Sequence, residues 1–172
     1  MPARASAAAS ARTRSRGTFA TARIADALID PIARYVRGGG TPEDAASTLR
    51  GLGFVRPASR IAEHLGHGEA ARIAATSGPG SPVGLLADAV SASLIATALE
   101  LLDDEIDHPA ALDVLARHVL DFPLAECSLG RFASVARAQA LCDRARDLAP
   151  LVPEPTLSRL EAHAARGRDL YR

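Results

Sequence analysis

Aromatic residues are scarce in this chain: Phe, Tyr and Trp make up 3% of its 172 residues, and tryptophan is absent. Strands favour aromatic and β-branched side chains, whereas the sequence holds 37 alanines, the residue with the highest intrinsic helix propensity. Hydrophobic residues still form 48% of the chain, enough for one core built from Leu, Ile, Val and Ala. The composition therefore predicts a single all-α domain.

Lysine is also absent, and all 20 basic residues are arginine. A GC-rich coding genome accounts for this bias together with the alanine excess. Bidentate binding of phosphate or carboxylate by arginine is the functional alternative. There are only two cysteines, Cys127 and Cys142, and their spacing matches no zinc, haem or redox motif. Reduced thiols and a cytoplasmic location are therefore expected.

The first 17 residues contain no acid and four arginines, Arg4, Arg12, Arg14 and Arg16. They have no apolar run, which excludes a secretory signal. We expect a disordered basic tail here, and an organelle transit peptide is the alternative. The folded domain is then expected to span residues 18–172.

Proline and glycine divide that domain into short helices. The first is expected over residues 18–29, with Phe19 among its apolar positions, and a second short helix after Asp30-Pro31. Three glycines at 38–40 are expected to form a flexible joint. The clearest helix start is Thr41-Pro42-Glu43-Asp44, a capping residue followed by a first-turn proline and two acids. Further helices are predicted over about residues 57–65, 69–76, 109–120, 131–148 and 156–170.

One predicted helix, about residues 82–102, is apolar on nearly all sides, with Asp88 and Glu100 as its only charges. A helix that is apolar all round is normally buried. Its length would suit a bilayer, but those two acids and several Ser and Thr residues argue against a membrane span. The sequence thus predicts a compact bundle of seven or eight short-to-medium helices around this buried central helix.

The formal net charge is zero, but the charges are segregated along the chain. Residues 1–60 hold ten arginines against four acids, residues 61–130 two against eleven, and residues 131–172 eight against five. The basic ends either neutralise the acidic middle within one molecule or offer complementary surfaces to a partner.

The most acidic run carries a possible metal motif, in which Asp103, Asp104 and Asp107 form a DDxxD pattern. If a helix continues through this run, Asp103 and Asp107 share a face and can hold one Mg²⁺ together with a diphosphate. With the preceding Ala98-Leu-Glu-Leu-Leu it resembles the first aspartate-rich motif of the all-helical trans-prenyl diphosphate synthases. The resemblance implies Mg²⁺-dependent binding of an allylic diphosphate. The alternative is a solvated helix end before Pro109.

Residues 57–76 have the spacing of a helix-turn-helix, with Ala62 and Gly66 around the turn and Arg72 on the second helix. DNA binding through Arg72, with phosphate contacts from Arg12, Arg14 and Arg16, is therefore a second hypothesis. Two ordinary packed helices are the alternative.

Other candidate ligands lie in the same segment: Glu63, His64, His67 and Glu69 are metal ligands by type, although polar surface is the simpler interpretation. No catalytic motif with a nucleophile, a phosphate loop or a dinucleotide fingerprint is present, so no catalytic residue and no organic cofactor is assigned. The leading hypothesis is a non-enzymatic protein-interaction module, an adaptor or accessory subunit. Its partner is another protein or a second copy of the chain.

Overall fold

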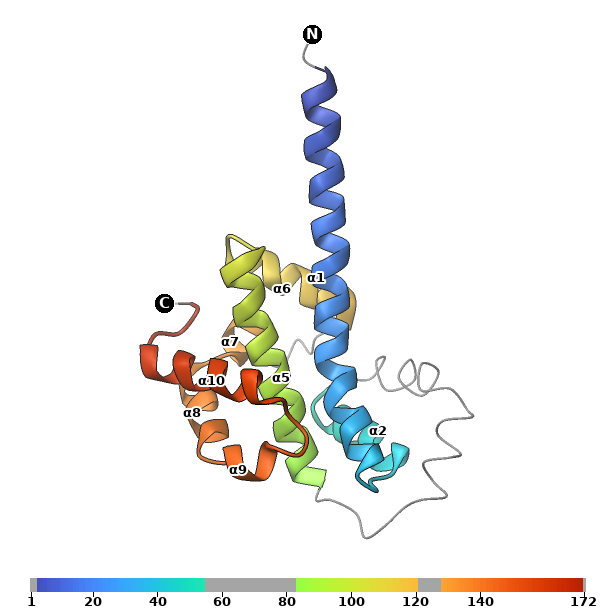
Figure 1. Ribbon diagram of the computed structural model, residues 1–172, viewed down its shortest axis with the longest axis vertical. Helices are drawn as coiled ribbons and strands as arrows, with labels where there is room; N and C mark the ends of the chain where they lie inside the picture. Colours follow the sequence, from blue (N-terminus) through green and yellow to red (C-terminus); the bar gives the residue numbers. More distant parts are fainter. Residues whose placement is uncertain (1–2, 55–82, 121–127, 172) are drawn as a thin grey trace.

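The computed structural model describes residues 3–54, 83–120 and 128–171, and all regular structure in these ranges is helical (Figure 1). The all-α class is confirmed for these ranges. The eight helices are α1 (Ala3–Arg37), α2 (Pro42–Gly51), α5 (Val83–Asp104), α6 (Pro109–Leu120), α7 (Leu129–Phe132), α8 (Val135–Cys142), α9 (Ala145–Leu148) and α10 (Glu154–Arg166).

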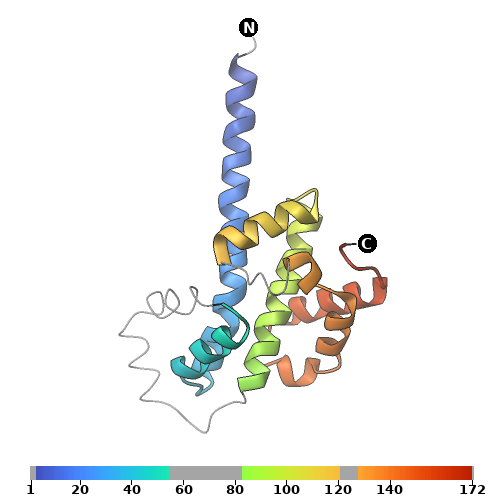
Figure 2. The same ribbon diagram turned by 180° about the vertical axis from the view of Figure 1, so that it is seen from behind.

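The central element is α5, as the sequence predicted. It contacts each of the other seven helices, and Figures 1 and 2 show it between α1 and α2 on one side and α8, α9 and α10 on the other. Its side chains Leu86, Val90, Ile95 and Leu101 are fully buried. In the described ranges, Gly84–Asp104 is the segment that is long and apolar enough to cross a membrane, and 67% of its most apolar window is buried among other helices. That burial is typical of a core helix.

The first helix differs from the prediction, because α1 runs without a break from Ala3 to Arg37 with Pro31 inside it. A separate helix after Asp30-Pro31 was expected. Ile24, Leu28 and Ile32 are buried on one continuous face of α1. Proline removes one hydrogen bond of the helix, and packing of this apolar face against α5 stabilises the helix across it.

Residues 3–17, where a disordered tail is expected, have a backbone that continues α1 as regular turns, and the disorder itself stays a prediction. They leave the body of the molecule as a projecting arm (Figures 1 and 2). Alanine and arginine are both strong helix formers, and extending an existing helix avoids the unfavourable nucleation step. We call residues 3–17 the arm.

The three glycines after α1 adopt a defined turn in place of the expected flexible joint. Gly39 has a φ of 101°, and the Gly40 amide donates to the Tyr35 carbonyl at 3.0 Å. A Cβ on Gly40 would lie 2.0 Å from Cε1 of Tyr35. Thr41 then caps α2 as predicted, because its hydroxyl accepts from the Asp44 amide at 3.0 Å.

The C-terminal third contains three short helices where one was expected over residues 131–148. The Ser128 and Ser134 side chains accept hydrogen bonds from the first turns of α7 and α8, so each serine starts a new helix. α10 likewise begins at Glu154 rather than near Thr156 and ends at Gly167, whose φ is 62°.

Hydrogen bonds hold the C-terminal residues Asp169 and Tyr171 against the neighbouring helices. The Tyr171 hydroxyl donates to Asp113 of α6, and the Gly130 amide donates to the same carboxylate at 2.9 Å. Asp169 accepts from the first amide of α8 at 2.7 Å. These contacts tie the C-terminus to α6, α7 and α8.

The predicted helix-turn-helix at 57–76, with Arg72 and the Glu63, His64, His67 and Glu69 group, lies outside the described residues, as does Cys127.

Candidate interaction site at the base of the arm

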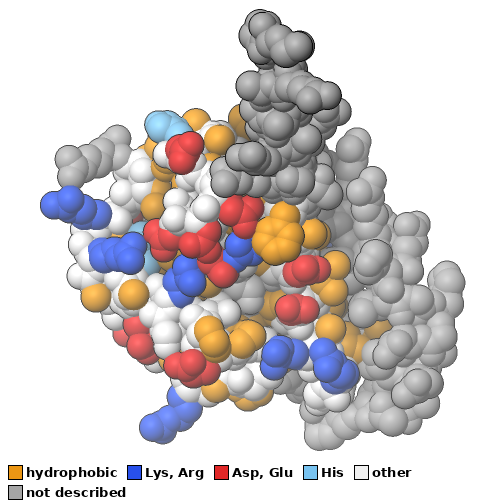
Figure 3. All heavy atoms as spheres, turned by 45° about the horizontal axis from the view of Figure 1, so that its top comes forward, with side chains coloured by type: hydrophobic (Ala, Val, Ile, Leu, Met, Phe, Trp, Pro, Cys, Tyr) orange, Lys and Arg blue, Asp and Glu red, His pale blue; other side chains and the backbone are white. Residues whose placement is uncertain are grey.

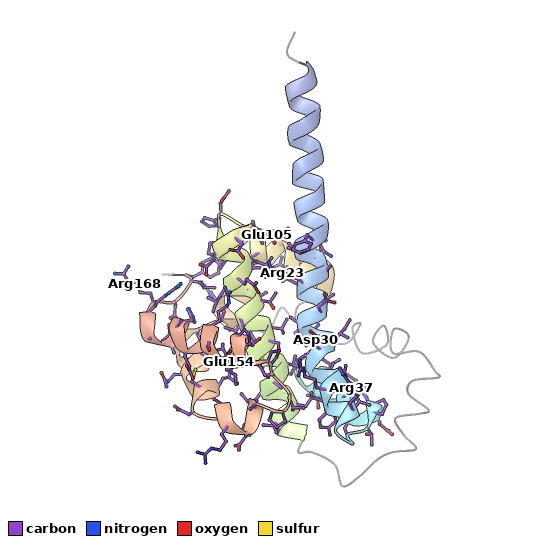
Figure 4. The ribbon with its side chains drawn as sticks, viewed as in Figure 1. Arg23, Asp30, Arg37, Glu105, Glu154 and Arg168 are labelled. Atoms are coloured by element: carbon purple, nitrogen blue, oxygen red, sulfur yellow. The ribbon has the colours of Figure 1, made fainter. Side chains whose placement is uncertain are left out.

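The arm joins the body where α1 meets the C-terminal end of α5. There Arg23 binds two carboxylates of the acidic run: Glu100 through Nη2, and Glu105 through Nη1 at 3.0 Å (Figure 4). The Arg23 and Glu105 side chains are 19% and 15% exposed. Glu105 Oε2 is the one buried side-chain oxygen among the described residues that has no hydrogen-bond partner. Arg23 is therefore the cation that balances this part of α5.

The pKa of Arg23 reflects its contacts with these two carboxylates. Burial lowers it, and the hydrogen bonds and charges of Glu100 and Glu105 outweigh burial and raise it above the ordinary arginine value. The guanidinium thus stays charged and shared between two carboxylates.

The acidic run does not continue α5. The helix ends at Asp104, and the Ile106 amide turns back to the Leu101 carbonyl at 2.7 Å. Asp103 and Asp107 consequently do not share a helix face, which was the geometric basis of the predicted Mg²⁺ site. Asp103 instead lies 3.6 Å from the Arg159 guanidinium. Within the described ranges, no group of three or more His, Cys, Asp or Glu side chains is placed to hold a metal ion.

We call the exposed end of this run, with its neighbours, the acidic corner: Glu100, Asp103, Asp104, Glu105 and Asp107. Asp103, Asp104 and Asp107 are exposed. Among the described side chains, ion pairs reach Glu100, Glu105 and Asp103 and leave Asp104 and Asp107 without one.

The segregated charges meet inside the molecule. Each of the four ion pairs between described side chains joins an arginine from a basic end of the chain to an acid of α5 or its C-terminal turn: Arg23–Glu100, Arg23–Glu105, Arg144–Asp88 and Arg159–Asp103. Neutralisation within one molecule therefore accounts for these four acids, Asp88, Glu100, Asp103 and Glu105. The arginines of the arm lie N-terminal to Arg23, within residues 3–17.

The register of α1 places arm arginines on the face that carries Arg23. Arg12, Arg16, Phe19 and Arg23 are separated by four, three and four residues, and such spacings share one helix face. We call these four residues the α1 stripe. Phe19, an apolar position of the first predicted helix, is 60% exposed, and the Arg23 guanidinium lies 5.8 Å from its ring centre. The stripe thus combines positive charge with an exposed aromatic ring.

A groove lies near the same end of α5, between α5 and α10. It has a volume of about 520 Å³ and is lined by Leu99, Asp103, Glu154, Pro155, Ser158, Arg159, Ala162, His163 and Arg166. His163, to which the sequence assigned nothing, is 3% exposed, and its Nε2 lies 3.0 Å from the Ala133 carbonyl. Because a carbonyl only accepts, Nε2 carries the proton. His163 therefore links α10 to the end of α7.

The sequence alone did not group Arg23 and Phe19 with Glu105, since Arg23 and Glu105 lie 82 residues apart in the chain. The recurrence of arginine at positions 12, 16 and 23 was the signal that could have marked the stripe.

Comparison with protein-family models, with curated proteins and with solved structures finds no match for this chain. Its function is therefore inferred from its own residues.

Proposed function

We propose that this chain is a helical protein-interaction module that docks its arm on an acidic surface of a protein partner. The observation that carries the proposal is the projecting half of α1, which continues the Arg23 face beyond the body and brings four arginines with no acid (Figure 1). An isolated helix of this length is marginally stable in water, so a partner that packs against it would stabilise it.

The contact made by Arg23 supports an acidic partner. One arginine of the stripe already holds two glutamates at a helix end. Complementary charge of this kind raises association rates and orients partners more than it adds affinity. Exposed Phe19 supplies the aromatic ring that favours a protein surface, because interface cores are enriched in aromatic residues and arginine.

The test compares two variants that each lose four positive charges. One variant loses them from the arm, and the other loses them from exposed positions of the body. In the arm variant Arg4, Arg12, Arg14 and Arg16 are replaced by Gln; in the control variant the exposed Arg34, Arg37, Arg50 and Arg146 are replaced by Gln. Tagged chains are purified at low salt, after nuclease treatment, from cells that also express the same chain untagged, and co-purifying proteins, the untagged chain included, are quantified by mass spectrometry. We expect a stoichiometric protein that wild type and control retain, that the arm variant loses, and that about 0.5 M salt releases.

Two results would overturn the proposal. Equal retention by the arm variant would place the partner elsewhere on the body. Salt-dependent binding of a short DNA duplex, lost in the arm variant while no protein is retained, would make the arm a nucleic-acid contact. DNA binding through 57–76 and the cytoplasmic location stay predictions, and Mg²⁺ binding at Asp103, Asp104 and Asp107 stays an alternative hypothesis that a Mg²⁺ titration tests.

A further inference from the structure

The arm and the remainder of the chain carry equal and opposite charge. Residues 1–17 hold four arginines and no acid, and residues 18–172 hold 16 arginines against 20 acids. The net charges are therefore +4 and −4. A second copy of the chain offers the arm a complementary body, and two such contacts cancel both charges.

The chain also contains the surface that the stripe binds. Within one molecule, Arg23 of the stripe holds Glu100 and Glu105 of the acidic corner. Asp104 and Asp107 of that corner are exposed and have no ion-pair partner among the described side chains. Figure 3, which looks toward the arm end of the body, shows acidic side chains gathered on the surface beside the base of the arm.

We infer that two copies of this chain form a reciprocal dimer, in which Arg12 and Arg16 of each arm dock on Asp104 and Asp107 of the other copy. The inference rests on the proposed function and names its partner. At a rise of 1.5 Å per residue the arm is about 22 Å long, which suffices to cross a helix end and its following turn. Two identical contacts related by a two-fold axis close the assembly and leave no free arm.

The experiment uses full-length chains and light scattering after size exclusion at low salt. Arg12→Glu with Arg16→Glu gives an arm-reversed chain, and Asp104→Arg with Asp107→Arg gives a corner-reversed chain. Wild type is expected to be dimeric. Each reversed chain alone is expected to be monomeric, with at least about tenfold weaker self-association, because like charges then face each other in both contacts.

Mixing the two reversed chains is the decisive step. The reversed arm of one then meets the reversed corner of the other, and the native arm meets the native corner, so the mixture is expected to regain the dimer. Arg146→Glu with Arg168→Glu changes the net charge by the same amount as the arm reversal at exposed positions of the body, and this control is expected to stay dimeric. Circular dichroism of each chain shows that it is folded.

A wild-type monomer at all concentrations, or a mixture of reversed chains that stays monomeric, would overturn the inference. The proposed function would stand in that case if a different protein is retained through the arm, so the two failures are distinguishable.

Discussion

Arg23 of α1 and Glu105 of the turn after α5 form an ion pair of 3.0 Å, although 82 residues separate them in the chain. Glu105 is mostly buried, and its second oxygen has no hydrogen-bond partner among the described residues. Arg23 therefore supplies the positive charge that compensates this carboxylate. The contact joins α1 to the turn after α5 close to the point where the arm leaves the body.

Replacing Arg23 by Leu is expected to lower the free energy of unfolding by about 2 kcal/mol, since a mostly buried carboxylate then loses its cation. Urea unfolding measures the effect. Arg34→Leu, at an exposed position of the same helix, is the control and is expected to stay within about 0.5 kcal/mol of wild type. Adding Glu105→Leu to Arg23→Leu is expected to recover part of the loss; a purely additive double variant would contradict the coupling.

Gly40 and Gly51 form a matched pair for a test of the glycine turn after α1. A Cβ at Gly40 would overlap the Tyr35 ring, whereas one at Gly51, the last residue of α2, meets nothing within 4 Å. Gly40→Ala is expected to destabilise the protein by at least about 2 kcal/mol. Gly51→Ala is expected to stabilise it by about 0.5 kcal/mol through helix propensity. Equal effects in thermal or urea unfolding would mean that the 38–40 turn is not packed as described.

The C-terminal contact of Tyr171 predicts a pH dependence. Burial, together with the hydrogen bond and negative charge of Asp113, raises the pKa of Tyr171 to about 12, against about 10 for an unfolded tyrosine. The folded state therefore keeps a proton that the unfolded state loses first. The stabilisation is complete below about pH 10 and is lost as the pH rises through about 12.

Absorbance of tyrosinate can follow this titration cleanly, because the chain has two tyrosines and no tryptophan. In a Tyr35→Phe background, Tyr171 is expected to ionise near pH 12 in the native protein and near pH 10 in denaturant. Asp113→Asn in that background should lower the native pKa. A native midpoint near 10 would show that Tyr171 is not held on α6.

The aspartate pattern at the end of α5 gives a prediction about metal. Because α5 ends at Asp104 and Asp103 lies near Arg159, we expect millimolar Mg²⁺ to leave the melting temperature of the wild type unchanged within about 1 °C. Arg159→Gln frees Asp103 and serves as the comparison. A Mg²⁺-dependent rise in melting temperature that Asp103→Asn and Asp107→Asn both abolish would instead establish the metal site.

Local signals in the sequence were sufficient for much of the fold. Alanine content and the scarcity of aromatics indicated helices, and Thr41 marked the start of α2. The all-round apolar pattern from 82 to 102 identified α5 as the centre. These features follow from propensity, capping and burial, which act over a few residues.

The interaction site was predictable only in part. The arm arginines were evident as a basic segment, but their register with Arg23 mattered only once residues 3–17 proved to continue the helix that carries Arg23. The prediction of a single helix over 131–148 failed partly because the Ser134 hydroxyl accepts a backbone amide and starts a new helix, α8. The chain breaks again before α9, where no side chain caps the helix.

The sequence by itself thus determined that this protein is helical, where its core helix runs and that its charge is divided among three segments, since composition and periodicity encode these properties locally. Only the tertiary structure decided which charges neutralise one another and which stay exposed. It brings Arg23 to Glu100 and Glu105, and Arg159 to Asp103, and it leaves Asp104 and Asp107 exposed. Ion pairing depends on distance in space, and the packing of α1 and α10 on α5 sets those distances.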